Sequence, residues 1–396
     1  IDLTISEKKI WETTAIGLPQ IEGGLSYQKK IDLEFDFPDD AITQPGNEFL
    51  SVFAADNVTQ AKLSVSQLLF DGTYIVGLRA ANTYYKLSED QNAKTILDRK
   101  VDVASSYYLV LVAGESLKIL RTSNENLQKV ITETKEILKQ GFIEETEVDQ
   151  LELSALKLQS RLIAAKRNRG IAMSMLKLSM GWDQKNELSL KDSLSLMVDQ
   201  ANFDALANES FNEASNVDLT ILTTQEKLLK LDMQRYKMER IPSLSAFYQY
   251  TNTAYQLDFD FYKDASWLNA QNVGLSLNIP IFSSGMQTAK IKQSELKLIQ
   301  IKNTKEHYES ALQVQHKNLS NQLSTKVLEK SIAEKSMKTA EKILDRGIKK
   351  HKEGLISSFD LTQLDNQLLE SQGTYINSLF ELLNAKTELD KIQNKF

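Results

Sequence analysis

The side chains that most often carry out chemistry in proteins are scarce in this 396-residue sequence. It has no cysteine and three histidines, His307, His316 and His351. The absence of cysteine excludes disulfides, thiolate metal sites and cysteine nucleophiles. No glycine-rich phosphate-binding motif is present, and no motif places a serine beside a histidine and an aspartate. The sequence therefore predicts a protein that is not an enzyme and that holds no cofactor or metal.

Two glycines are each followed by acidic residues. The acids are Glu144, Glu145 and Glu147 after Gly141, and Asp360 after Gly354. Carboxylates in the first turn of a helix suit its positive end, and Ser357, three residues before Asp360, fits a capping box. The residues themselves therefore indicate a role in helix capping.

The spacing of proline and glycine predicts the long helices that position these acids. Prolines occur only at 19, 38, 45, 242 and 280, and residues 73–140 and 286–353 contain three glycines in all. A helix of that length reaches about 100 Å, which is typical of a coiled coil or a tube. A heptad seam supports this at Leu361, Leu368, Tyr375, Leu382 and Leu389. A plain amphipathic helix against a core is the alternative. At the end of the second stretch, His351 is expected to complement the negative helix C-terminus.

The chain contains an internal duplication. Gly72 and Gly285 end similar strand-to-helix motifs and lie 213 residues apart, as do Gly141 and Gly354. Each copy is predicted to hold two strands, a long helix and a shorter helix. The predicted parts are a first repeat 1–181 (helix 1–17, β-hairpin 18–71, helical hairpin 72–181), a linker subdomain 182–223, and a second repeat 224–396 (helix 224–241, β-hairpin 242–283, helical hairpin 284–396).

The predicted strands alternate between apolar and polar residues. The pattern holds over 20–36, 60–69 and 272–281, and it is weaker after Ser243 because Phe247 falls on the polar face. Aromatic residues crowd the hairpin ends at Phe35, Phe37, Phe49, Phe53, Tyr255, Phe259, Phe261, Tyr262 and Trp267. Alternation with aromatic ends is typical of a membrane β-barrel, although a soluble sheet with one wet face alternates too.

Charge and hydropathy narrow the function classes further. The chain has 47 Lys and Arg against 53 Asp and Glu, a net charge of −6. It therefore lacks the excess of positive charge that binding of nucleic acid needs. No run of 18 apolar residues occurs, which predicts no transmembrane helix.

Four strands cannot close a membrane barrel, whose smallest members have about eight, and open edges are not tolerated in lipid. The chain must therefore oligomerise. Two copies would give eight strands and three would give twelve, and the strand count alone does not distinguish a dimer from a trimer.

This organisation resembles the TolC-type outer-membrane efflux family. The resemblance rests on Leu18-Pro19 and Ile241-Pro242 before the strands, on the turns 69–72 and 281–285, and above all on the tip 354–361. It covers nearly the whole chain. It implies a mostly α protein with a β-barrel portion: a homotrimer with a twelve-stranded barrel in the outer membrane of a Gram-negative bacterium, continued by a periplasmic α-helical tunnel.

The resemblance also implies a function and its residues. The expected role is the passive exit duct of a tripartite efflux pump or type I secretion system, with a periplasmic adaptor and an inner-membrane transporter as partners. The expected aperture ring is Glu147 and Asp360; a further acid of the family is Gln363 here. The expected adaptor-docking residues are Gly141, Glu144, Glu145, Gly354, Ser357 and Ser358. The alternative is a periplasmic coiled-coil adaptor or scaffold with a soluble sheet. The short helix before Pro19 leads us to expect further residues upstream of Ile1.

Overall fold

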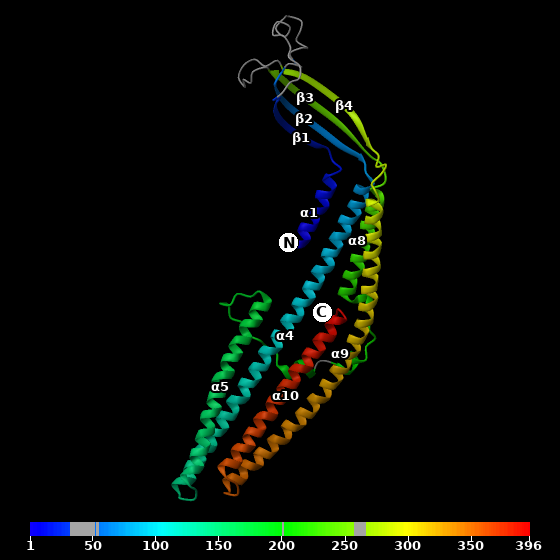
Figure 1. Cartoon of the computed structure of the whole chain (residues 1–396). Helices are drawn as coiled ribbons and strands as arrows, with labels where there is room; N and C mark the ends of the chain where they lie inside the picture. The colour runs from blue at the N-terminus through cyan, green and yellow to red at the C-terminus, as the bar shows by residue number, and fades with distance from the viewer. Residues whose placement is uncertain (32–51, 53–54, 200–201, 257–266) are drawn as a thin grey trace. The chain divides into compact units, whose positions relative to one another are not determined.

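The computed structural model describes residues 1–396 except 32–51, 53–54, 200–201 and 257–266 (Figure 1). The chain separates into two compact units, residues 1–90 with 221–304 and residues 91–220 with 305–396. Each unit contains parts of both predicted repeats, so the boundaries of the compact units differ from the boundaries of the repeats. The duplication itself stays a prediction.

The strands of the first unit form one antiparallel sheet in the order β1-β2-β3-β4 (Figure 1). They are β1 (Gln20–Lys29), β2 (Asn57–Phe70), β3 (Ser243–Gln256) and β4 (Trp267–Asn278). The register places Val65 opposite Ile21 on one side and opposite Tyr248 on the other, and Tyr248 opposite Val273. Residues directly opposite each other share a face, so these apolar residues of all four strands lie on a single face, as the alternation predicts.

Phe247 interrupts the polar face of the sheet, and the structure explains how this face accepts it. Phe247 lies directly opposite Gly274 on β4. A Cβ atom at Gly274 would approach the Phe247 ring to 2.8 Å. The missing side chain at Gly274 therefore makes the space that the ring fills, and glycine inside a strand often has this meaning.

The two outer strands are paired on one side only in the described part of the chain. β1 pairs with β2, β4 pairs with β3, and every residue of β1 is exposed. Of the predicted aromatic belt, Tyr255 and Trp267 lie at the ends of β3 and β4. The other members lie outside the described residues: Phe35, Phe37, Phe49, Phe53, Phe259, Phe261 and Tyr262.

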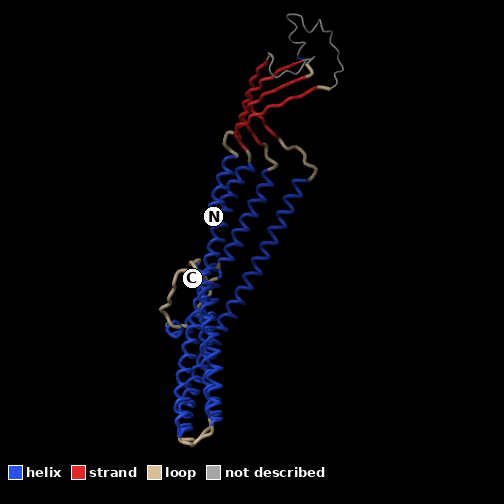
Figure 2. The backbone as a smooth tube through the Cα atoms, turned by 90° about the vertical axis from the view of Figure 1, so that its left-hand side faces the viewer, coloured by secondary structure: helices blue, strands red, loops and turns tan. Residues whose placement is uncertain are grey.

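Long helices follow the sheet, as the proline and glycine spacing predicts. They are α4 (Gly72–Lys139) and α9 (Met286–Lys352), of 68 and 67 residues. Asp71 begins α4 by accepting hydrogen bonds from the backbone N–H groups of Thr73 and Tyr74. Each long helix turns back into a shorter one, α5 (Glu145–Met180) or α10 (Ser358–Ile392), through a short loop (Figure 2). The remaining helices are α1 (Asp2–Ala15), α6 (Leu194–Asp199), α7 (Phe203–Ala207), the 3-10 turn Glu213–Ser215 and α8 (Val217–Met238).

One helix in the described part of the chain, α4, is apolar enough over 18 residues to cross a membrane by length and composition. Polar residues are scattered through this helix, so it contains no uninterrupted apolar run of 18 residues. α4 also supplies Tyr108, Val110 and Leu111 to buried clusters with other helices. Helix packing therefore accounts for at least part of its apolar character.

The heptad seam of α10 forms part of the core of the second unit. Leu361, Leu382 and Leu389 are almost completely buried, while Leu368 and Tyr375 are half-buried. Linker residues Leu194 and Val198 belong to the same cluster as Leu382 and Leu389. This packing fixes α10 along its length and so fixes the hairpin tip at its start.

Candidate functional site

The candidate site is the pair of hairpin tips, which lie at the same end of the second unit (Figures 1 and 2). Each tip begins with a glycine in the left-handed region, Gly141 at φ +79° and Gly354 at φ +71°. The backbone N–H groups of Phe142 and Leu355 donate to the carbonyls of Ile137 and Lys350, five residues back. This is a Schellman turn, and its bonds repeat at the same offset of 213 residues in the two tips.

The second tip caps its own helix. Ser357 is the N-cap of α10, and its Oγ accepts a hydrogen bond from the Asp360 backbone N–H at 3.1 Å. The Asp360 carboxylate accepts from the Ser357 backbone N–H at 3.2 Å. The predicted capping box is therefore present. The Asp360 side chain remains exposed, so capping leaves it accessible to ions.

The first tip has no side-chain cap on its own helix, and its acid reaches the neighbouring hairpin. Glu144 is the N-cap of α5 but accepts no capping hydrogen bond. Glu147, in the first turn of α5, instead accepts a hydrogen bond of 2.5 Å from the backbone N–H of Ser358. A carboxylate at a helix N-terminus is favoured by the orphan donors and by the helix dipole. Glu147 thus caps α10 from the other hairpin, which the local sequence pattern did not reveal.

Two further contacts lie close to the hydrogen bond between Glu147 and Ser358: one made by His351 and one ion pair made by Lys352. The His351 ring lies 3.1 Å from the Ser358 Oγ, and Lys352 forms an ion pair of 3.0 Å with Glu133 of α4. Burial lowers the pKa of His351, and the charges of Glu147 and Glu133 raise it in part. The expected role at the helix C-terminus needs a charged ring, whereas burial favours the neutral ring; the contact with Ser358 is therefore the better account of His351.

Both predicted aperture residues line one open cleft between the tips, with a volume of about 760 Å³. Glu147 is half-buried and Asp360 is exposed. Among the predicted docking residues, Gly141, Glu144, Glu145 and Gly354 are exposed and Ser357 is half-buried, but Ser358 is completely buried. The side chain of Ser358 therefore adds nothing to the exposed surface of the tip. Within the described residues, no group of three His, Cys, Asp or Glu side chains could hold a metal ion.

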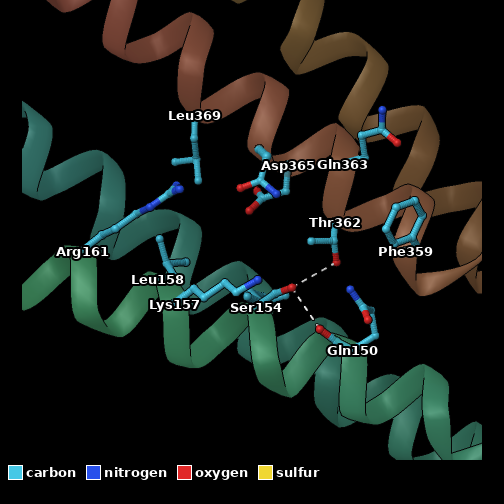
Figure 3. Close-up of a pocket in the computed structure, with 12 residues that line it drawn as sticks. Gln150, Ser154, Lys157, Leu158, Arg161, Phe359, Thr362, Gln363, Asp365 and Leu369 are labelled. Carbon is cyan, nitrogen blue, oxygen red and sulfur yellow. Dashed lines mark hydrogen bonds between the residues drawn. The ribbon is translucent and has the colours of Figure 1, made fainter.

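A second cleft, of about 270 Å³, lies beside the tips between α5 and α10 (Figure 3). Lys157 and Arg161 of α5 line one wall, and Asp365 of α10 lines the other, together with Gln363. Ser123 of α4 donates to the Asp365 carboxylate at 3.2 Å. Burial raises the pKa of Asp365, while the Ser123 hydrogen bond and the Arg161 charge lower it. Asp365 is not among the site residues predicted from the sequence; the available signal is a carboxylate between seam residues Leu361 and Leu368.

Comparisons with solved structures give the fold. CusC, described in connection with transmembrane channel formation, has 15% identity and a TM-score of 0.75 over 99% of this chain and 86% of its own. The outer membrane protein VceC from Vibrio cholerae has 13% identity and a TM-score of 0.72, covering 99% and 90%. The CmeC outer membrane channel of Campylobacter jejuni has 16% identity and a TM-score of 0.70, covering 100% and 83%. No protein-family model and no curated protein matches the sequence.

These likenesses extend over almost the whole chain and confirm the coarser part of the predicted fold, a mostly helical chain with a small antiparallel sheet. The closed barrel, the trimer and the duplicated repeat stay predictions. At 13–16% identity the likenesses establish the fold alone. The role of the tips therefore rests on this chain's own residues.

Proposed function

We propose that this chain is one protomer of a trimeric outer-membrane channel of a Gram-negative bacterium. The observation that carries the proposal is the fold, which the chain shares over 99% of its length with outer membrane channels and proteins. The sheet supports it, because one apolar face runs across all four strands and both outer strands have an unpaired edge in the described part of the chain. Three copies complete a twelve-stranded barrel with no open edge in lipid.

The oligomeric state is the first test. Native mass spectrometry in detergent should give a trimer, and separation of cell membranes should place the protein in the outer membrane. A folded monomer in detergent contradicts the shared barrel. A water-soluble protein in the periplasm favours the alternative, an adaptor or scaffold with a soluble sheet.

The second test asks which side chains of β4 face lipid and which face water. Leu275 and Leu277 are well exposed on the apolar face, and Ser276 between them lies opposite Ser245 on the polar face. Arginine at a lipid-facing position near mid-membrane costs about 2–4 kcal/mol. Leu275→Arg and Leu277→Arg should therefore weaken barrel insertion, while Ser276→Arg should be mild because it faces water. Equal losses at the three positions contradict the assignment of the faces.

The channel is a passive conduit rather than an enzyme. It serves as the exit duct of a tripartite efflux pump or a type I secretion system, and an inner-membrane transporter supplies the energy. A periplasmic adaptor docks on the exposed tips, where Glu144 and Glu145 are exposed at the start of α5. Glu144→Lys with Glu145→Lys should abolish adaptor binding in a pull-down with the cognate adaptor and leave the trimer intact. Unchanged binding removes the tips from the docking surface.

Glu147 and Asp360 form the charged ring of the closed aperture. Threefold symmetry gathers six carboxylates, and like charges this close are costly unless cations offset them. Trivalent cations on the periplasmic side should therefore block the reconstituted channel. Neutralisation of both residues, Glu147→Gln with Asp360→Asn, should relieve the block and lower cation selectivity. Single-channel recording of the parent and of the double variant measures the block. If the double variant is blocked as strongly as the parent, neither residue lines the aperture.

A further inference from the structure

One stretch of α5 is exposed on every side. Residues 166–171, here called the basic segment, are all exposed, and six consecutive residues cover more than a full helical turn. Three of them carry a positive charge: Lys166, Arg167 and Arg169. None of these cations makes an ion pair in the described part of the chain, and α5 has no acidic residue after Glu152. The basic segment therefore presents unpaired positive charge to its surroundings.

The equivalent stretch of the second hairpin is covered. The offset of 213 residues relates α5 to α10 along their length, so residues 379–384 match the basic segment. The leucines that take the place of the first and third cation, Leu379 and Leu382, are almost completely buried. They belong to the same apolar cluster as Leu194 and Val198 of α6 in the linker. The described linker residues thus cover α10 in this stretch and leave the basic segment of α5 exposed.

The linker carries the charge that complements the basic segment. Residues 182–223 contain eight acidic residues and two lysines, a net charge of −6 that equals the net charge of the whole chain. Asp199 ends α6 and Asp204 lies in α7, and both are exposed. Neither carboxylate makes an ion pair in the described part of the chain. Opposite charges on two patches favour their contact and disfavour other pairings.

These acids lie at the level of the basic segment along the hairpins. Burial is the main reason for the raised pKa of Tyr375 on α10, and the charge of Asp199 contributes, so Asp199 lies near Tyr375. Tyr375 corresponds to Leu162 of α5, about one turn before the basic segment. The hairpin tips lie at one end of the second unit, so matching residues are about equally far from that end (Figures 1 and 2). A second copy set beside the first, without a shift along the helices, brings its acids to the level of these cations.

We propose that the linker of one copy docks on the basic segment of α5 in the next copy, with Asp199 and Asp204 facing its cations. Two apolar side chains that are exposed in the single chain, Leu196 of α6 and Ile171 of the basic segment, add apolar area to the contact. The contact joins two different patches, so it passes from each copy to the next and can close a ring. This ring rests on the trimer of the proposed function.

Reversal of the charges tests the contact. A linker variant carries Asp199→Lys with Asp204→Lys, and an α5 variant carries Lys166→Glu with Arg167→Glu. Each should raise the rate of subunit exchange in detergent about tenfold, because attraction becomes repulsion. Native mass spectrometry with isotope-labelled protein measures this rate. The effect should shrink at high salt, and a chain with all four changes should exchange at about the parent rate.

A matched control reverses two charges elsewhere. Lys129 of α4 and Lys342 of α9 are exposed and lie 213 residues apart, nearer the tips than the basic segment. Lys129→Glu with Lys342→Glu should leave the exchange rate unchanged. Circular dichroism of every variant should show the parent's helix content, since all of the changed residues are exposed.

Co-expression of the two variants shows which chain supplies each side of the contact. The linker variant and the α5 variant offer each other opposite charges, whereas neither offers them to its own kind. Mixed trimers should therefore exceed the share expected from random assembly, as counted by native mass spectrometry of chains with tags of different mass.

Three results overturn the proposal. Variants that exchange as slowly as the parent, or no faster than the control, show that this contact is absent. Faster exchange that the four-change chain does not reverse assigns the cations to a different acidic partner. Reversal without an excess of mixed trimers places the contact within one chain. In each case an assembled parent leaves the channel proposal in place, whereas a monomeric parent contradicts both.

Discussion

The two hairpin tips share one turn but use their acids in different ways. In the second tip, Ser357 and Asp360 cap each other within one helix. In the first, Glu144 stands where Ser357 does and makes no capping hydrogen bond, and Glu147 binds the start of the other hairpin. We infer from this difference that the N-cap residue directs the acid three positions later. A serine keeps it at its own helix, while a glutamate leaves it free to join two hairpins.

The largest effect is expected from Glu147→Ala. This change leaves the Ser358 N–H buried without its charged partner, at a cost of about 1.5–3 kcal/mol. Amide hydrogen exchange at residues 358–361 should report it as a loss of protection by a factor of roughly ten to a hundred, since each 1.4 kcal/mol is tenfold. Glu147→Gln keeps an acceptor and should lose less.

Glu145→Ala is the matched control for this prediction. Glu145 lies in the same first turn of α5 but is exposed. Its loss should change protection of α10 by a few tenths of a kcal/mol at most. Equal effects from Glu145→Ala and Glu147→Ala would show that only the general charge of the tip matters, and would remove the difference between the two tips.

The next effect is expected from Ser357→Ala in the second tip. Loss of an N-cap serine costs about 1 kcal/mol. The loss should be confined to the first turn of α10, because Glu147 still binds the Ser358 N–H. Ser357→Thr keeps the hydroxyl and serves as the control. A loss that spreads to α5, followed by hydrogen exchange at residues 145–148, would show that the second tip also depends on its neighbour.

A smaller and more diagnostic effect is expected from Glu144→Ser, which gives the first tip the capping-box pattern of the second. Glu147 should then turn back to its own helix. Protection of the start of α5 should rise by about 0.5–1 kcal/mol, and protection of Ser358 should fall. The opposite signs are the decisive feature. A rise at both helices would mean that the N-cap residue does not direct Glu147.

The sequence predicts what is local or periodic and misses what depends on contacts between hairpins. Proline and glycine spacing predicts α4 and α9, and alternation predicts which strand residues share a face. The capping box of Ser357 and Asp360 follows from their spacing alone. Glu147 has the same spacing from its glycine as Asp360, so no local pattern shows that its partner lies 211 residues away. Asp365 is missed for the same reason, because its surroundings come from α4, α5 and α9.

The smallest effect concerns pH, and it arises because the tips differ once more at His351. The equivalent residue of the first hairpin is Leu138, so only the second tip can gain a proton here. Burial lowers the pKa of His351 from its ordinary value of 6.5. The unfolded state therefore binds the proton more readily, and the stability that His351 contributes is present above pH 6.5 and is lost as the pH falls below it.

Protection of Ser358 should accordingly decrease below about pH 6.5, by at most about 1.4 kcal/mol per pH unit. Hydrogen exchange corrected for the intrinsic pH dependence of amides measures it. His351→Gln should flatten the profile, whereas His307→Gln, an exposed position on α9, should leave it unchanged. A profile that stays steep without His351 would place the titrating group elsewhere.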